Sequence, residues 1–193
     1  MTHPIHHVCV YASSSDAVDP VHAAAARTLG RGMAERGQTL VYGGGNIGLM
    51  GVIAREIHAG GGHVIGVIPE KLRDLELAYE LADELIVTQS MRERKAAMEA
   101  RADAFVALPG GLGTLEEILE VLVLKQLCYH NLPIVFLNTL GIFDSLFRLL
   151  EDLCTGHFVK ESHRALYHVA AEPEEVFHHF ETYTAPVPET KLF

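Results

Sequence analysis

The feature that most constrains how this chain folds is a regular alternation of short apolar, β-branched runs with longer helical patterns. Strands are predicted over residues 5–11, 38–42, 63–68, 84–88, 104–108, 133–138 and 167–170. Helices are predicted over 20–36, 47–59, 90–102, 114–129, 143–155 and from Pro173 onward, with 70–83 as a loop holding at most a helical turn. Such alternation indicates βαβ units and a parallel sheet covered on both faces. We therefore expect an α/β fold with a Rossmann-like, doubly wound parallel sheet.

Length and charge narrow the possibilities further. A chain of 193 residues can build one full core, and no stretch resembles a linker, repeat or low-complexity segment. We expect a single domain over 1–193, with its core over about 5–181 and a short C-terminal tail. The formal net charge of -10 argues against nucleic acid or an anionic membrane as partner. An anionic small ligand remains possible, because a nest of backbone N–H groups can hold phosphate on an acidic protein.

Cysteine and histidine usage bears on compartment and metals. Cys9, Cys128 and Cys154 form no CxxC pair, which is typical of reduced, mostly buried thiols. The N-terminus lacks a secretory signal and no apolar stretch is long enough to span a bilayer, so we expect a cytoplasmic protein. The 12 histidines are scattered, without HExxH or a Cys/His cluster, so we expect no metal site.

The segment 109–117 carries the strongest chemical signal. It leaves the apolar strand 104–108 and enters a helix through Gly110, Gly111 and Gly113. Glycines let a ligand approach the backbone closely, and a helix start offers free N–H groups and a positive dipole end. We therefore expect an anion cradle here, with the Thr114 hydroxyl either capping the helix or contacting the anion.

A purely structural explanation of this segment exists. Thr114-Leu115-Glu116-Glu117 also matches a capping box, in which Glu117 bonds back to the Thr114 N–H. A cap alone needs neither the double glycine nor Gly113, so a functional role is the favoured interpretation.

A second glycine-rich segment covers residues 42–51. Gly43, Gly45 and Gly48 satisfy GxGxxG between a strand and a helix, and Glu70 lies near the expected distance downstream. This pattern favours a dinucleotide site, although here it falls on the second βαβ unit rather than the first. A tight turn with close helix packing is the alternative, and the absence of GK[ST] excludes a P-loop.

Cations gather at the start of the predicted 90–102 helix. Arg92, Arg94 and Lys95 stand at a helix N-terminus, whose dipole repels positive charge. Ion pairing on a solvated face is the usual explanation of such a run. Because the next strand leads directly into segment 109–117, Arg94 could face Glu117 across a shared cleft.

Two motifs resemble those of a known family. Met91-Arg92-Glu93-Arg94-Lys95 resembles MHxRK, and 109–117 matches PGGxGTxxE without mismatch. Together with the GLMG ending of the second glycine segment, they resemble the Lonely Guy (LOG) family, often mislabelled as lysine decarboxylases. The resemblance runs from about residue 8 to 180. It implies a Rossmann-like homodimer that cleaves the N-glycosidic bond of a cytokinin riboside 5′-monophosphate, or of AMP, and needs no cofactor.

The same resemblance implies roles for individual residues. Arg94 and Glu117 would be the catalytic pair, with Glu117 stabilising an oxocarbenium-like sugar and orienting water. Arg94 would hold the leaving base or position Glu117. The implied substrate contacts are Ser13, Ser14, Gly44, Gly45, Glu76, Lys95, Gly110, Gly111, Gly113, Thr114 and Glu116. Between Glu116 and Glu117, which one holds ribose and which performs chemistry stays open.

The chain also departs from the family pattern. Arg92 replaces the motif histidine, Tyr79 stands where a histidine is common, and Tyr11-Ala12-Ser13 replaces Cys-Gly-Ser. The helix after the loop lacks a threonine-tryptophan pair that many members have near the base pocket. Base preference is therefore left open.

Two alternatives to a hydrolase are considered: a non-catalytic carrier of nucleotide or molybdenum cofactor, and a dinucleotide oxidoreductase. A pyridoxal-dependent decarboxylase is disfavoured, because no lysine of this sequence is identifiable as a Schiff-base lysine.

Overall fold

The computed structural model describes residues 4–75 and 77–186, and they form an all-parallel, seven-stranded sheet in the order β4-β3-β2-β1-β5-β6-β7. The strands are β1 (His7–Tyr11), β2 (Thr39–Tyr42), β3 (Val64–Pro69), β4 (Glu84–Thr88), β5 (Ala104–Ala107), β6 (Ile134–Leu137) and β7 (His168–Ala170). Each falls within two residues of its predicted bounds. The predicted α/β, doubly wound parallel sheet is confirmed.

The helices alternate with these strands as expected. They are α1 (Pro20–Glu35), α2 (Gly48–Ala59), α3 (Glu70–Arg73), α4 (Met91–Glu99), α5 (Leu112–Gln126), α6 (Asp144–Thr155) and α7 (Pro173–Thr182), with 3-10 turns η1 (Thr139–Gly141) and η2 (Glu161–Leu166). The expected helical turn within 70–83 is α3. The start of α5 differs in a way that matters below, because the helix begins two residues before the predicted position.

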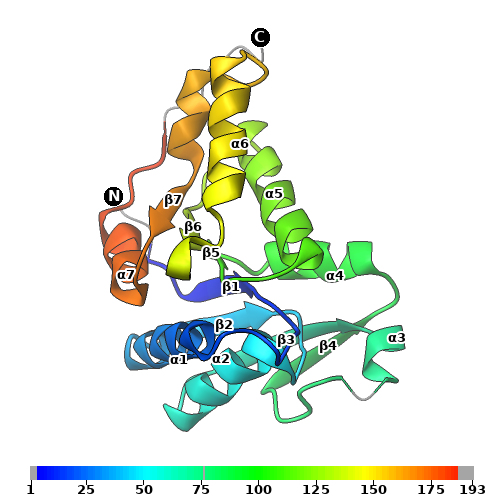
Figure 1. Ribbon diagram of the computed structural model, residues 1–193. Coiled ribbons are helices and arrows are strands. Elements are labelled where there is room, and N and C mark those ends of the chain that lie inside the picture. Colours follow the sequence, from blue (N-terminus) through cyan, green and yellow to red (C-terminus); the bar gives the residue numbers. More distant parts are fainter. Residues whose placement is uncertain (1–3, 76, 187–193) are drawn as a thin grey trace.

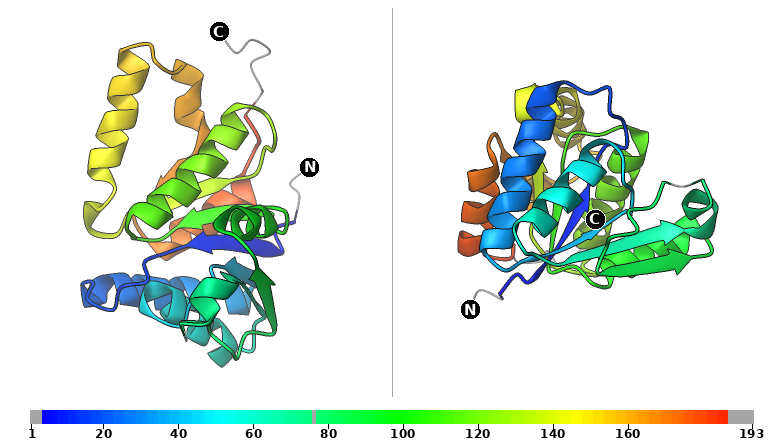
Figure 2. Two further views of the ribbon diagram at one scale, coloured as in Figure 1. Left: turned by 90° about the vertical axis from the view of Figure 1, so that its right-hand side faces the viewer. Right: turned by 90° about the horizontal axis from the view of Figure 1, so that it is seen from below.

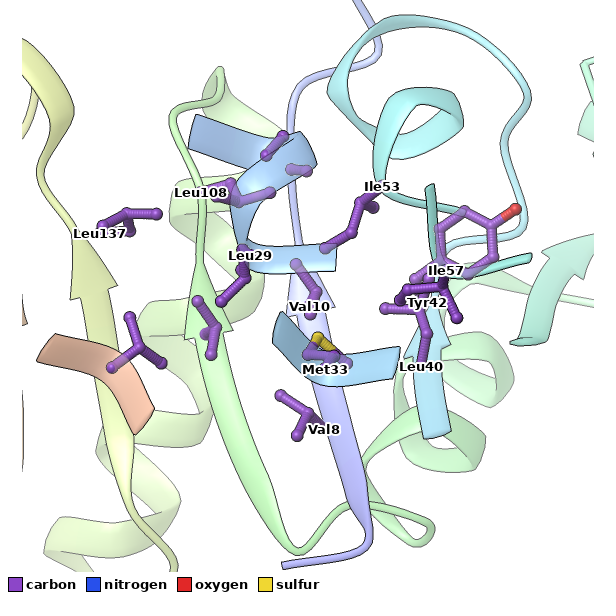
Figure 3. Packing of buried hydrophobic residues seen from close by; sticks show 14 of the residues in the cluster. Val8, Val10, Leu29, Met33, Leu40, Tyr42, Ile53, Ile57, Leu108 and Leu137 are labelled. Carbon is purple, nitrogen blue, oxygen red and sulfur yellow. The ribbon is translucent and has the colours of Figure 1, made fainter. Parts of the chain in front are cut away.

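The sheet is packed on both faces because alternate side chains of each strand point to opposite sides. On β1, Val8 and Val10 face the layer of α1, α2 and α7, whereas Cys9 and Tyr11 face the layer of α4, α5 and α6. Figure 3 shows Val8 and Val10 beneath side chains of α1 and α2. In Figure 1, α1 and α2 lie below the central strands and α5 lies above them; the right-hand view of Figure 2, seen from below, has α1 and α2 in front of the sheet.

The order of the strands determines where a ligand can bind. The chain winds outward from β1 through β2 and β3 to β4, then returns so that β5 pairs with the other side of β1. In open parallel sheets this reversal opens a crevice at the carboxyl ends of the two central strands. The loops after β1, β2 and β5 meet there, and two of them are the glycine-rich segments identified in the sequence (Figure 1).

Candidate active site

A cavity of about 470 Å³ lies at this crevice, within the range typical of small-molecule sites. Several separate stretches of the chain line it. They contribute Ala12, Ser13, Ser14, Ser15, Gly43, Gly45, Ile47, Met50, Ile68, Leu72, Leu77, Met91, Arg94, Gly111, Leu112, Gly113, Thr114, Glu116 and Glu117. Both glycine-rich segments and the MRERK motif therefore border one cavity.

A buried ion pair lies in the wall of the cavity. Arg94 Nη1 donates to Glu117 Oε1 at 2.5 Å, and each side chain is 8% exposed. Arg94 Nε donates to the Val67 carbonyl at 3.1 Å, so the guanidinium is held at two points. Gly43 leaves room for it, because a Cβ there would lie 2.0 Å from Arg94 Nη2. The expected meeting of Arg94 and Glu117 is confirmed.

The start of α4 explains how Arg94 becomes buried in a helix with three cations. Ser90 caps the helix by accepting from the Glu93 N–H, and Glu93 Oε2 accepts from the Gln89 N–H. This reciprocal cap offsets the unfavourable dipole. The helix then turns Arg94 and Met98 inward to the sheet.

The environment of Glu117 alters its acidity. Burial raises the pKa of the carboxyl, and the adjacent Arg94 guanidinium lowers it by less, so the pKa of Glu117 lies above that of an ordinary glutamate. A carboxylate whose pKa is perturbed inside a cavity is the kind of group that general-base catalysis uses.

The alternative explanation, in which Thr114 and Glu117 form a capping box, is wrong. The N-cap of α5 is Gly111, which has no side chain to cap the helix, and the first helical bond runs from the Leu115 N–H to the Gly111 carbonyl. Thr114 lies inside the first turn, and Glu117 pairs with Arg94 instead of its own helix. The helix start is thus left free of side-chain caps where it borders the cavity, and Glu117 serves one partner.

The glycines of segment 109–113 have different reasons for being glycine. A Cβ on Gly110 would overlap Thr114 Oγ1 at 2.0 Å, so packing requires this glycine. Within the described part of the chain, a Cβ on Gly111 or Gly113 would meet nothing within 4 Å, and neither has a positive φ. Neither internal packing nor backbone conformation explains these two glycines, whereas close approach of a ligand to the backbone would.

The start of α2 differs from that of α5. The Gly48 N–H donates to Asp16 Oδ1 at 2.8 Å, and the Met50 N–H donates to the Ser13 carbonyl at 3.3 Å. Gly48 has φ +60 and a Cβ there would lie 2.5 Å from the Ser13 carbonyl oxygen. The protein itself therefore occupies donors that a dinucleotide phosphate would need.

The other expected substrate contacts separate into three groups. Ser13, Ser14, Gly45 and Glu116 line the cavity with the residues already described. Outside its lining lie Gly44, Gly110 and Lys95; the Lys95 ammonium contacts Glu116 and lies 2.5 Å from Glu120 Oε2. Glu76 falls outside the described residues. Lys95 thus meets carboxylates of α5, with Glu116 among them, rather than the cavity.

Sequence reasoning did not identify the apolar part of the cavity. This wall consists of Ile47, Met50, Ile68, Leu72, Leu77, Met91 and Leu112. Apolar residues in loops and helix ends carry no motif that separates a ligand wall from core. The exposure of Leu112, at 86%, is visible in the structure alone.

Across 4–75 and 77–186 no three His, Cys, Asp or Glu side chains are grouped to hold a metal ion, and no helix could cross a bilayer. No lysine of these residues lines the cavity. Burial lowers the pKa of Lys125 to about 8, but its ammonium lies over the Tyr183 ring rather than in the site.

The fold and the cavity together define a class of protein. The cavity is bordered by glycines, lies at the switch point of a parallel sheet and has a buried guanidinium–carboxylate pair in its wall. These features are those of a Rossmann-like protein that binds a small anionic ligand.

Comparison with known proteins identifies the family. A family model described as "Possible lysine decarboxylase" matches residues 50–180. A probable cytokinin riboside 5′-monophosphate phosphoribohydrolase of Oryza sativa subsp. japonica is 42% identical over 179 residues, covering 93% of this chain and 73% of that protein. A cytokinin riboside 5′-monophosphate phosphoribohydrolase of Arabidopsis thaliana is 40% identical over 176 residues, covering 91% and 77%. The chain belongs to this phosphoribohydrolase family, as its two motifs predicted.

Solved structures confirm the fold. The molybdenum cofactor binding protein of Rippkaea orientalis superimposes with a TM-score of 0.72 at 24% identity, covering 92% of this chain and 96% of that one. The Moco carrier protein of Chlamydomonas reinhardtii gives 0.69 at 24% identity, covering 91% and 95%. At this identity the likeness concerns the fold alone.

Proposed function

We propose that the protein hydrolyses the N-glycosidic bond of a nucleoside 5′-monophosphate whose base is adenine or an N6-modified adenine. Water adds to C1′, the bond from C1′ to the base breaks, and free base and ribose 5-phosphate leave. The observation that carries the proposal is the buried Arg94–Glu117 pair beside an uncapped helix start in one nucleotide-sized cavity. A protein that merely binds nucleotide has no need of such a pair.

The start of α5 supports an anchor for the phosphate. The N-cap of α5 is a glycine, so the N-cap residue offers no side chain to the first-turn N–H groups, and among the described residues Gly111 and Gly113 leave the backbone open to approach. Free N–H groups and the positive helix end both favour an anion. Ser13 and Ser14 line the same cavity and offer hydroxyls. Binding energy from the phosphate would then place the ribose beside the carboxylates of α5.

Glu117 is assigned to C1′ of the ribose, where it would stabilise the positive charge that develops as the bond to the base breaks. Bond cleavage builds positive charge on the ribose, and a carboxylate in a desolvated wall stabilises that charge strongly. Once ionised, Glu117 also orients or deprotonates the attacking water. Its contact with Arg94 fixes the carboxylate in place, since Arg94 is itself tied to the Val67 carbonyl.

Arg94 is assigned to the departing base, and Glu116 is assigned to the ribose hydroxyls. The guanidinium borders the cavity and can donate to the ring of the departing base while it positions Glu117. Glu116 is 57% exposed at its side chain and is contacted by Lys95, which suits a carboxylate that holds ribose hydroxyls. The apolar wall formed by Met50, Ile68 and their neighbours suits a planar base and an apolar N6 substituent.

Assembly and location belong to the same proposal. Leu112, Val123 and Leu127 of α5 and its C-cap are 86%, 48% and 42% exposed, which supports burial of this helix against a second copy. Three free cysteines, two of them buried, suit a reducing compartment, and we place the protein in the cytoplasm.

The decisive experiment is direct. The protein is incubated with AMP and with isopentenyladenosine 5′-monophosphate, and free base and ribose 5-phosphate are measured by chromatography. We expect equimolar products, and a loss of roughly 10²–10⁴-fold in kcat for Glu117→Gln with nucleotide binding retained. Glu35→Gln, which changes an exposed carboxylate on α1, serves as the control.

Two results would contradict the proposal. Tight nucleotide binding without release of base from either substrate would favour the carrier alternative. Saturable binding of a nicotinamide dinucleotide, with no effect of AMP, would favour the oxidoreductase alternative. Full activity in Glu117→Gln would leave the reaction standing and remove Glu117 from it.

A further inference from the structure

Residues 77–83, which precede β4, reach the cavity through Leu77. The backbone of this segment is joined to the second glycine segment. The Asn46 N–H donates to the Leu77 carbonyl at 2.9 Å, and the Tyr79 N–H donates to the Gly44 carbonyl at 2.8 Å. Gly45 and Ala78 form an isolated antiparallel bridge between these bonds. The position of one segment therefore determines the position of the other.

A chain of three side chains holds this segment from behind. Tyr79 Oη lies 2.9 Å from His58 Nδ1, and His58 Nε2 lies 2.9 Å from Asp83 Oδ2. Because a carboxylate only accepts, His58 Nε2 donates to Asp83, and His58 Nδ1 forms the bond with the Tyr79 hydroxyl. Tyr79 is 5% exposed, so the hydroxyl end of the chain starts from a buried ring.

Asp83 joins the chain to the sheet. Its Oδ2 also accepts from the Val64 N–H at 2.8 Å, at the start of β3, and lies 3.4 Å from His63 Nδ1. Burial opposes ionisation of Asp83, but the bonds from His58 and Val64 outweigh it, so the pKa of Asp83 is lowered. The carboxylate is therefore a charged, multiply bonded end point. These bonds connect α2, segment 77–83 and β3.

A surface ion pair that only stabilises the fold is a poor explanation of the bonded residues Tyr79, His58 and Asp83. An exposed histidine–carboxylate pair contributes little to stability. A connected chain that includes a buried tyrosine is more restrictive, since each bond orients the next. His58 stands in the last turn of α2, whereas Met50 in the first turn lines the cavity. The helix thus contacts the cavity at one end and segment 77–83 at the other.

We propose that His58 is a positioning residue, which acts through Tyr79 and Asp83 to hold Leu77 and the Gly44–Gly45 backbone in the geometry that binds the nucleotide. The inference rests on the proposed function, because it concerns the same cavity. Arg94 and Glu117 make no bond to this chain of residues. Its loss therefore weakens binding and leaves the chemical step of the bound nucleotide intact.

The test compares kcat and KM for AMP in His58→Ala and Tyr79→Phe. We expect KM to rise about fivefold, the size of one hydrogen bond, with kcat within about twofold of the unaltered protein. His58→Gln should restore KM, because its amide can donate to Asp83 and accept from Tyr79. His63→Ala removes the neighbouring histidine that has no contact with Tyr79 and should leave KM unchanged.

Failure of this inference can be separated from failure of the proposed function. Calorimetry measures the Kd of AMP for Glu117→Gln with and without His58→Ala, and needs no turnover. If no variant cleaves AMP but His58→Ala still weakens its binding about fivefold, the positioning role stands and the hydrolase proposal falls. An unchanged Kd in His58→Ala, or a loss that His58→Gln fails to restore, would overturn the positioning role.

Discussion

The two glycine-rich segments both lead from a strand into a helix at the same cavity, but they offer it different chemistry. At α2, Asp16 and the Ser13 carbonyl already bond the N–H groups of Gly48 and Met50. At α5, the N-cap Gly111 has no side-chain cap. A glycine pattern before a helix therefore does not identify a phosphate site by itself; the availability of its N–H groups does.

The two segments also differ in the polarity of the side chains that they present to the cavity. The side chains that the α2 segment contributes to the cavity, Ile47 and Met50, are apolar, whereas α5 adds Thr114, Glu116 and Glu117 to the apolar Leu112. One helix start thus suits the base, and the other suits the phosphate and ribose. The second βαβ unit matches GxGxxG because packing requires its glycines, with Gly48 at φ +60 against the Ser13 carbonyl.

Among the glycine substitutions the largest effect is expected at Gly43, where the segment before α2 touches the Arg94–Glu117 pair. A Cβ in Gly43→Ala would lie 2.0 Å from Arg94 Nη2 and would push the guanidinium from Glu117. Misplacement of this size lowers kcat roughly 10²-fold. Gly45→Ala is the comparison, since its Cβ meets the mobile end of Met50 at 2.7 Å and should cost less. Equal kcat values in the two variants would contradict the role given to Arg94.

Gly48→Ala tests whether the α2 glycines serve packing. A left-handed φ and a Cβ 2.5 Å from the Ser13 oxygen should lower the free energy of unfolding by about 2 kcal/mol. Urea denaturation measures the change. If stability were unaltered and nucleotide affinity fell instead, Gly48 would belong to a phosphate site and the comparison between the two segments would fail.

Most of the fold follows from local pattern. Buried parallel strands read as apolar runs, and all seven were predicted close to their observed bounds. The meeting of Arg94 and Glu117 was also predictable, since their motifs flank one strand. The start of α5 was not, because a capping box is a local rule and the partner of Glu117 lies 23 residues away on α4.

Other parts of the site depend on contacts that leave no local pattern. His58, Tyr79 and Asp83 are joined across 21 and 25 residues, and each looks ordinary in its own segment. The motif lysine Lys95 is predicted to contact substrate, and in the structure its ammonium contacts Glu116 and Glu120, which its motif did not reveal. Spacing predicted which helices approach each other, whereas side-chain packing decided which charges meet.

The dependence of kcat on acid pH tests the carboxylates of α5. Of the two helices, α5 alone lines the cavity with carboxylates, so only the α5 side of the cavity changes its charge as these groups titrate. Burial raises the pKa of Glu117, and activity requires its ionised form. At saturating nucleotide, kcat should therefore fall about tenfold per pH unit below a midpoint that lies above the pKa of an ordinary glutamate, about 4.3. A midpoint at or below that value would contradict the assignment of Glu117.

The smallest expected effects are those of Gly113→Ala on the free energy of unfolding and on KM. They distinguish Gly113 from the glycines that packing requires. Nothing described in the chain lies within 4 Å of a Cβ in Gly113→Ala, and the position is in the first turn of α5. Alanine should therefore raise the free energy of unfolding by about 0.5 kcal/mol, because it favours a helix. The same methyl group stands where the phosphate would approach, so KM for AMP should rise about threefold. Stability and binding thus move in opposite directions, which packing alone cannot produce. A stabilised variant with unchanged KM would move the phosphate away from α5 and remove the main difference between the two segments.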